Sequence, residues 1–365
     1  MIDNMRRTNM KKGKEKLMGM ASVLLAALAV ACVAVRLPSG FGQNTAVAAA
    51  GFILPYGAAD GYRSADETDD TVPSSAEPSS KESTPPPSSV PSSSYPGSSS
   101  SGKESAAPSG TDSVESGVEE MCINTGGSKY ENFYVKNSNQ HHSIDIGEEL
   151  KKQPDVKIKK NAGPQVLIYH THTTEAFDGV TRSTDKSLSV CAVGDAIAKQ
   201  LEDAGIGVIH DTTYHDYPAY NGSYGRSIVT MENDLKKYPS IQVTLDIHRD
   251  AMTRSDGTRL KPTAIVNGKK AAQVMIISGC DDTGDLGFPD WEYNMRLAVR
   301  LQKSMADLYP NLARPLNFCA RRYNENVTHG SLLVEIGTDA NKLDEAVYGG
   351  ELFGKALAAT LSQLT

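Results

Sequence analysis

Strands and helices alternate in the hydrophobic pattern of the chain beyond residue 160. Short apolar runs rich in Val, Ile and Leu predict strands, and longer segments with apolar residues at helical spacing predict amphipathic helices. The predicted strands are 166–170, 207–211, 240–250, 272–279 and 331–338, and the predicted helices are 189–205, 225–237, 291–309 and 344–364. This alternation predicts an α/β fold: a single domain with a mostly parallel twisted sheet flanked by helices on both faces.

A different pattern opens the chain. Residues 17–35 form an uncharged apolar run of nineteen residues, and a basic tail, 1–16, precedes it. The run is long enough to cross a bilayer, so we expect a transmembrane helix at 17–36. The positive-inside rule then places the amino terminus in the cytoplasm and the remainder outside. Cleavage as a signal peptide near AVAAAG (46–51) and lipidation at Cys32 are the alternatives, but the full length of the run favours a permanent anchor.

Residues 37–128 are predicted to be a linker. From about residue 56 the composition is dominated by Ser, Pro, Gly and acidic residues, which bury too little apolar surface to offset the entropy of ordering. We therefore expect a disordered tether, followed by the catalytic domain at 129–365. The polar stretch at the start of that domain, 128–154, is expected to cap or wrap it, with His141 and His142 at its surface.

Net charge and cysteine content exclude several classes of protein. The net charge is −7 and the basic residues after the predicted anchor are dispersed, so nothing indicates nucleic-acid binding. The five cysteines are an odd number and no CxxC occurs, which argues against a disulfide framework and a cysteine zinc knuckle.

The segment VLIYHTHTTEAF, 166–177, carries the clearest chemical signal. An apolar strand runs into His170 and His172, and Glu175 follows in the turn. Because side chains alternate along a strand, the two histidines can point the same way. Two imidazoles and a carboxylate at a strand end suit a catalytic zinc ion, and a hydrogen-bonded histidine pair is the alternative.

Two further predicted strands end in polar groups, LDIHRDA at 245–251 and LLVEIGT at 332–338. Ligands of open α/β sheets collect at the carboxyl ends of strands, so we expect His248 and Glu335 near His172. A core histidine and a buried salt bridge to an arginine are the alternative readings of His248 and Glu335. Together the three segments predict a Zn²⁺ hydrolase in which two histidines and a carboxylate hold the metal and a second carboxylate moves the proton.

The segments VLIYHTHTTEAF, HDTTYHDYPAYNGSYGRS and VTLDIHRDA closely resemble the stage II sporulation protein P family of endospore-forming bacteria. That family is similar to zinc-dependent N-acetylmuramoyl-L-alanine amidases. The resemblance implies a membrane-anchored enzyme that cleaves the muramoyl–alanine amide of peptidoglycan, and also peptide cross-links, during engulfment. It implies action in the space between mother cell and forespore, with stage II sporulation proteins D and M as partners.

The resemblance also implies roles for particular residues. His172 and His248 match the first and third zinc ligands of the amidases, and Glu335 matches their catalytic glutamate. The amidases take their middle ligand from a glutamate just before the following helix, where this chain has Ser189 and Val190, so we assign that role to Glu175. His170 is then a partner of a ligand or an alternative ligand.

Substrate-binding residues are predicted from the segments next to these ligands. Arg249 follows the ligand His248 and is expected either to clamp a peptide carboxylate or to support the site through a salt bridge. Tyr217, Tyr220 and Tyr224, in the YPAYNGSYGRS segment, are expected to line a glycan groove, against the alternative of a surface loop that does not contact substrate.

Two other functions compete with the amidase. One is a catalytically inactive wall-binding scaffold that recruits other peptidoglycan hydrolases, which the presence of His172, His248 and Glu335 disfavours. The other is a zinc peptidase or deacetylase that acts on different bonds. The fragments released from peptidoglycan separate these functions, since amide cleavage liberates an L-alanine amino terminus and deacetylation liberates acetate.

Overall fold

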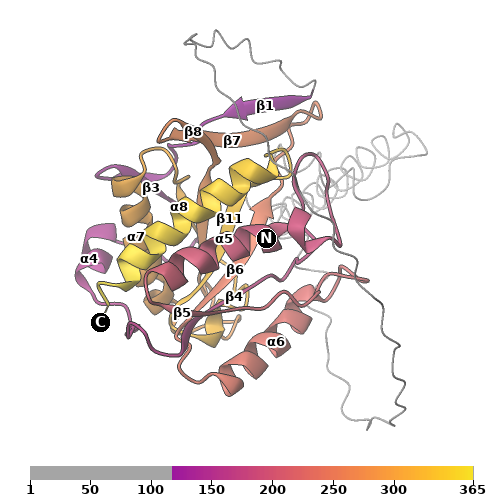
Figure 1. Ribbon diagram of the computed structural model, residues 1–365. Coiled ribbons are helices and arrows are strands. Elements are labelled where there is room, and N and C mark those ends of the chain that lie inside the picture. Colours follow the sequence, from indigo (N-terminus) through magenta and orange to yellow (C-terminus); the bar gives the residue numbers. More distant parts are fainter. Residues whose placement is uncertain (1–116, 365) are drawn as a thin grey trace, which may run out of the picture. The chain divides into compact units, whose positions relative to one another are not determined.

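The computed structural model describes residues 117–364, which contain a main sheet of eight strands (Figure 1). The predicted anchor at 17–36 and most of the predicted linker lie outside these residues. In the part described, no helix is both long and apolar enough to span a membrane. In spatial order the strands of the main sheet are β2 (Ser128–Tyr130), β3 (Phe133–Asn137), β10 (Leu316–Cys319), β9 (Val274–Gly279), β11 (Ser331–Thr338), β6 (Val243–Asp250), β4 (Pro164–Tyr169) and β5 (Gly207–His210).

The main sheet is mixed but mostly parallel, as predicted: five of its seven strand pairings are parallel and two are antiparallel. Strands β11, β6, β4 and β5 are mutually parallel, but β9 runs antiparallel to β11, and β10 and β3 follow the direction of β9. Strand β2 is again reversed against β3. The connection between β6 and β9 explains the reversal. The chain passes through β7 and β8 rather than a crossover helix, so β9 starts at the end of the sheet where β6 stops.

Helices cover both faces of the sheet, as the sequence predicts. Val166 and Ile168 of β4 pack into the large core with α5, while Leu167 and Tyr169 pack on the opposite face with Met231 of α6. This alternation follows from the two-residue period of a strand. Figure 1 shows α5 and α8 side by side on one face. The helices are α4 (Ile146–Lys151), α5 (Val190–Asp203), α6 (Ser223–Lys237), α7 (Trp291–Leu308) and α8 (Leu343–Leu361), with short 3-10 helices η1 (Lys186–Leu188) and η2 (Glu325–Val327).

A second, three-stranded sheet contains β1 (Val118–Met121), β7 (Arg259–Val266) and β8 (Lys269–Ala272). Asn267 and Gly268 join β7 to β8 with positive φ angles of 49° and 76°, the geometry of a tight hairpin turn. Strand β1 pairs in parallel with β7 although it lies in the segment that the sequence assigns to the linker. The folded domain therefore includes β1, which lies within the predicted linker.

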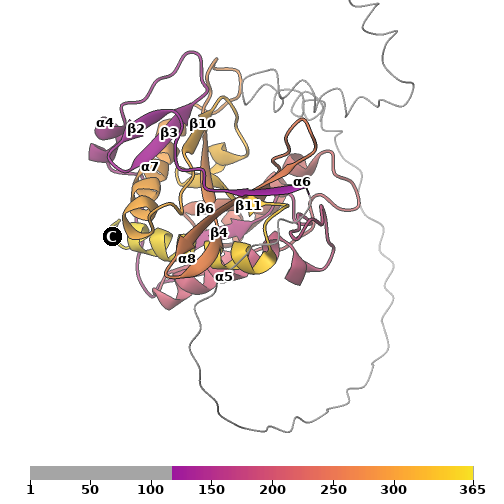
Figure 2. The ribbon, with the colours of Figure 1, turned by 90° about the horizontal axis from the view of Figure 1, so that it is seen from above.

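The first part of the segment 128–154 joins the main sheet as strands β2 and β3, which the expectation of a cap or wrap did not include. Strands β2 and β3 form a hairpin that extends the edge next to β10 (Figure 2), and Phe133 and Val135 are buried. Helix α4 follows and contacts α7. Asp145 is its N-cap, because the Asp145 side chain accepts from Glu148 N. These strands are too short and too polar for the hydrophobic pattern to reveal them.

Candidate metal centre

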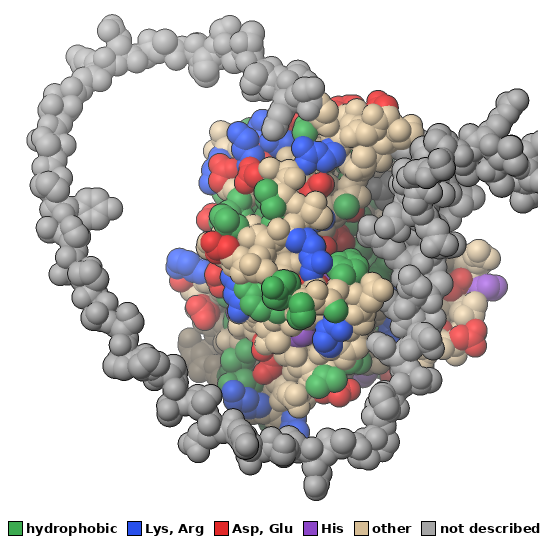
Figure 3. Space-filling model, turned by 90° about the vertical axis from the view of Figure 1, so that its right-hand side faces the viewer, with side chains coloured by type: hydrophobic (Ala, Val, Ile, Leu, Met, Phe, Trp, Pro, Cys, Tyr) green, Lys and Arg blue, Asp and Glu red, His purple; other side chains and the backbone are tan. Residues whose placement is uncertain are grey.

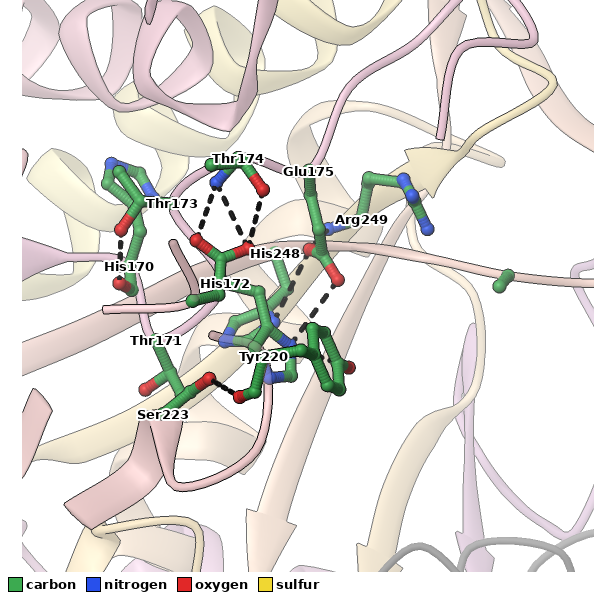
Figure 4. Close-up of polar contacts among 12 residues, drawn as sticks. His170, Thr171, His172, Thr173, Thr174, Glu175, Tyr220, Ser223, His248 and Arg249 are labelled. Atoms are coloured by element: carbon green, nitrogen blue, oxygen red, sulfur yellow. Dashed lines mark hydrogen bonds and ion pairs between the residues drawn. The ribbon is translucent and has the colours of Figure 1, made fainter. Parts of the chain in front are cut away.

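Parallel pairing of the central strands brings the predicted polar residues to one edge of the sheet. Strands β4, β6 and β11 are neighbours and parallel, so their carboxyl ends meet. His248 near the end of β6 is the direct register partner of Glu335 on β11. The turn after β4 supplies the remaining predicted residues, as Figure 4 shows.

His172, Glu175 and His248 form a buried cluster whose potential ligand atoms all lie within 4.8 Å of one another. Glu175 bridges the two rings, with Oε1 3.5 Å from His172 Nδ1 and Oε2 3.4 Å from His248 Nδ1 (Figure 4). Two imidazoles and one carboxylate form the ligand set of many catalytic zinc sites. Moreover, Nε2 of His172 is buried and has no hydrogen-bond partner within the described residues, so the cluster fits a metal ion.

Asp246 orients His248, and the sequence analysis missed it. Its Oδ1 lies 2.8 Å from His248 Nε2, an ion-pair contact without the alignment of a hydrogen bond, and the same carboxylate accepts from Thr171 N at 2.8 Å and Thr171 Oγ1 at 2.6 Å. The contact leaves Nδ1 of His248 facing Glu175. A carboxylate behind a ligating histidine fixes its tautomer and raises its basicity. The two-residue spacing of Asp246 and His248 on one strand is the signal that could have identified it.

Electrostatics favour a cation at this cluster. Burial lowers the pKa of His248, but the carboxylates of Asp246 and Glu175 outweigh it and hold that pKa well above the usual value. Burial acts in the opposite sense on Glu175, yet His248 and His172 hold its pKa well below the usual value. The Asp246 and Glu175 carboxylates thus make this position favourable for positive charge, which a bound metal ion would supply in place of the His248 proton.

Glu335 lies beside the cluster on a separate strand. Its Oε2 is buried without a hydrogen-bond partner among the described residues. Burial first, and then the charge of Asp250, raise the pKa of Glu335 to about 8. The sequence left open a salt bridge from Glu335 to a buried arginine. The buried Arg314 instead forms its ion pair with Asp250. Glu335 is thus a carboxyl group that can take up and release a proton.

His170 does not join the cluster. It is fully buried, its Nδ1 lies 2.8 Å from Ile247 O, and its Nε2 lies 2.8 Å from His210 Nε2. Burial and the neighbouring His210 lower the pKa of His170 to about 3, so the ring is neutral. Strand β4 ends at Tyr169, and the turn that follows breaks the alternation expected to aim both histidines the same way. His170 instead holds the end of β4 against β6.

The HDYPAYNGSYGRS segment supports the turn that carries the cluster. Asp216 is fully buried and accepts from Thr174 Oγ1 at 2.6 Å. His215 is also buried, with Nδ1 2.8 Å from His170 O. These contacts fix the backbone on both sides of His172, which explains the polar residues in this unusual motif.

The three predicted tyrosines lie at different distances from the cluster. Tyr220 stacks on the His172 ring with centroids 4.5 Å apart, and Tyr224 meets the same ring edge-on at 5.7 Å. The Arg182 guanidinium lies 5.3 Å from the Tyr220 ring centroid. Tyr217 is 54% exposed and contacts Tyr214 instead.

On the face shown in Figure 3, acidic, basic and hydrophobic side chains are interspersed.

Arg249 directs its side chain to backbone carbonyls. Nε donates to Ala176 O at 3.0 Å and Nη2 donates to Thr181 O at 2.6 Å. Its backbone N–H donates to Glu175 Oε2 at 3.1 Å. Arg249 therefore ties the loop after Glu175 to β6 and helps to orient the middle residue of the cluster.

A second group of potential ligands, His142, Cys280 and Asp282, lies elsewhere. Cys280 follows the end of β9, which is antiparallel to β11, so this group is at the opposite edge of the sheet. The Asp282 carboxylate already accepts from the backbone N–H groups of Gln140 and His141. That carboxylate therefore has a structural role in fixing the loop before α4.

The fold and the site define an α/β protein with a buried His–Glu–His cluster at the strand ends of a mixed sheet. The family model described as stage II sporulation protein P matches residues 93–358, and the chain belongs to this family. Stage II sporulation protein P of Bacillus subtilis (strain 168) is 29% identical over 198 residues, which are 49% of this chain and 47% of that protein. The match thus spans about half the length of that curated relative.

Solved structures give weaker matches. The CwlD amidase from Clostridioides difficile, solved in complex with the GerS lipoprotein, is 12% identical, with 55% of this chain and 98% of that chain covered and a TM-score of 0.34. The N-acetylmuramoyl-L-alanine amidase AmiC2 of Nostoc punctiforme is 14% identical, with 55% and 96% covered and a TM-score of 0.31. A metallo-carboxypeptidase from Burkholderia cenocepacia is 8% identical, with 60% and 68% covered and a TM-score of 0.35. TM-scores this low carry no argument about chemistry.

Proposed function

We propose that this protein is a zinc-dependent N-acetylmuramoyl-L-alanine amidase that cleaves peptidoglycan in sporulating cells. The observation that carries the proposal is the buried cluster of His172, Glu175 and His248, beside Glu335 on the adjacent strand, whose Oε2 has no hydrogen-bond partner in residues 117–364. Family membership supports the sporulation context.

The residues divide the chemistry between them. Zn²⁺ held by His172, Glu175 and His248 would polarise the scissile carbonyl and lower the pKa of water at the site. Glu335 takes a proton from the attacking water and returns it to the amide nitrogen, so that one water is consumed and a carboxylate and an amine are released. Asp246 keeps His248 in the tautomer that aims Nδ1 at the cluster.

The remaining predictions belong to the same proposal. The substrate is peptidoglycan, with Tyr220 and Tyr224 next to the cluster and Tyr217 further out as glycan contacts. Cleavage of peptide cross-links is the second activity, and stage II sporulation proteins D and M are the partners. A helix at 17–36 anchors the chain, with the catalytic domain outside the cytoplasm during engulfment.

Digestion of purified peptidoglycan sacculi tests the proposal. The protein, with and without a chelator, is incubated with sacculi and the soluble fragments are identified by mass. We expect stem peptides with a free L-alanine amino terminus, only when zinc is present, and split cross-links from the second activity. Release of acetate alone would make the protein a deacetylase. Folded, zinc-free protein that binds sacculi and releases nothing would establish the scaffold function instead.

A further inference from the structure

Arg314 is a buried cation beside the candidate centre. It is 3% exposed and lies just before β10, where its neighbour Ala313 bridges to Val274 at the start of β9. Val274 pairs with Ile336, the residue after Glu335, so Arg314 enters the sheet at the edge that carries the cluster.

The Arg314 side chain reaches across that edge to β6. Its Nη1 lies 2.9 Å from Asp250 Oδ2 at the end of β6, although β9 and β11 lie between β10 and β6 in the sheet. Its positive charge acts on Glu335, whose pKa it lowers against the stronger effects of burial and Asp250. Arg314, Asp250 and Glu335 therefore form one polar group adjoining the metal ligands.

Several atoms of this group lack aligned hydrogen-bond partners among the described residues, although Asp250 Oδ1 accepts from Ala251 N at 2.7 Å. Nε and Nη1 of Arg314 donate no aligned hydrogen bond within residues 117–364. Asp250 Oδ2 and Glu335 Oε2 accept none within the same residues. Burying a guanidinium with one poorly aligned ion pair is costly, because each unmet donor loses its hydration without compensation. Such a side chain at a site edge points to a ligand that completes its hydrogen bonds.

The ligand expected here is a carboxylate. A guanidinium presents a planar fork of donors that matches a carboxylate in a bidentate pair. On the proposed function, Glu335 returns its proton to the leaving amide nitrogen, so the departing peptide lies on the Glu335 side. Stem peptides carry free carboxylates. Arg249, the residue that the sequence singles out for this role, already donates to backbone carbonyls.

We propose that Arg314, with Asp250 beside it, forms a subsite that binds a carboxylate of the stem peptide. The subsite rests on the proposed function for its ligand, but its own test measures binding rather than cleavage. Asp250 holds the guanidinium in place through Nη1, and the incoming carboxylate completes the donors that Asp250 leaves unmet.

Calorimetric binding of free stem peptide to the zinc-loaded full chain tests the subsite. The probes are a stem tripeptide with free carboxylates and the same tripeptide with every carboxylate converted to an amide. We expect the wild type to bind the acid ~10–100-fold more tightly than the amide, the range for charged hydrogen bonds. Arg314→Gln should abolish this preference, and Arg314→Lys should retain only part of it. Arg254→Gln, which removes a surface arginine paired with Glu119, should retain it fully.

Equal binding of acid and amide by the wild type would overturn the subsite, whether or not Arg314→Gln folds. A preference that persists in a folded Arg314→Gln variant with normal zinc content would overturn it too, because the carboxylate would then bind elsewhere. The amidase proposal is judged separately. If the protein releases nothing from sacculi but still prefers the acid in an Arg314-dependent way, the subsite stands and the amidase proposal is refuted. If it cleaves sacculi but binds acid and amide equally, the amidase proposal stands and the subsite is refuted.

Discussion

At the scale of single residues, the environment of each carboxylate decides its role. Glu175 lies between two imidazoles that hold its pKa well below the usual value, which suits a metal ligand. Burial raises the pKa of Glu335 to about 8, which suits proton transfer. Two chemically identical side chains thus have different pKa values and different expected roles because their surroundings differ.

Glu335→Gln is expected to lower the rate of amide cleavage by about 10²–10⁴-fold, because it removes the proton acceptor and leaves the ligands intact. Zinc per chain should stay at the wild-type level. Turnover on sacculi and metal content are measured on the same preparation. Loss of zinc in this variant would mean that Glu335 is itself a ligand.

Glu175→Ala is expected to weaken zinc binding by more than the ~10–100-fold typical of residues that only support a ligand. The reason is that it removes the carboxylate lying within 3.5 Å of both histidines. Competition with a chelator of known affinity measures the change. Glu232→Ala, at an exposed position on α6, is the matched control and should bind zinc as the wild type does. Equal affinity in both variants would remove Glu175 from the ligand set.

Sequence reasoning finds the cluster but not all the residues around it. His172 and Glu175 follow the apolar strand β4 and His248 lies near the end of β6, so their meeting at one edge could be predicted. The role of Asp246 could have been predicted from its two-residue spacing to His248. The position of Arg314 could not, because this residue lies in a loop and reaches the cluster only through the pairing of β9 with β10 and β11.

At the scale of elements, the buried central strands, the short edge strand β5 and the amphipathic helices were predictable, while β1, β2, β3, β7, β8 and β10 were not. Strand β6 is buried over nearly its whole length and β11 over most of it, so their apolar runs stand out. The β7–β8 hairpin carries an Asn267–Gly268 signal that marks its turn. The direction of β9 depends on this hairpin, and the hydrophobic pattern of a strand contains no information about its direction.

Close packing of α5 on α8 gives an element-scale prediction. A Cβ at Gly350 would lie 2.8 Å from Val193 Cγ1, so Gly350→Leu should lower the free energy of unfolding by about 1–3 kcal/mol. Thermal unfolding followed by circular dichroism measures the change. Lys355→Leu, at an exposed position of the same helix, adds the same side chain without a clash and should leave the transition nearly unchanged. Similar transitions in both variants would contradict the tight α5–α8 contact.

At the scale of the whole molecule, buried charge links stability to pH. Glu325 is 1% exposed, its Oε2 accepts from Gly279 N at 2.7 Å, and burial holds its pKa well above the usual value. The folded state therefore retains a proton that the unfolded chain releases above about pH 4.5. This contribution to stability is fully present below that pH and is lost as the pH rises.

Glu325→Gln removes this titration while keeping an acceptor for Gly279 N. The free energy of unfolding of the wild type minus that of the variant should fall as the pH rises from 4 towards 8. Urea unfolding of both proteins across this range measures the difference. A difference that stays constant, or that increases with pH, would show that Glu325 is ionised in the folded protein.

The location of zinc tests the account most directly. Anomalous diffraction at the zinc edge, on crystals of the zinc-loaded protein, places the metal without reference to activity. The predicted result is one anomalous peak that lies ~2.0–2.2 Å from ligand atoms of His172, Glu175 and His248, the usual distances of zinc to nitrogen and oxygen. A peak at His142, Cys280 and Asp282 instead, or none at the predicted cluster, would contradict the central claim.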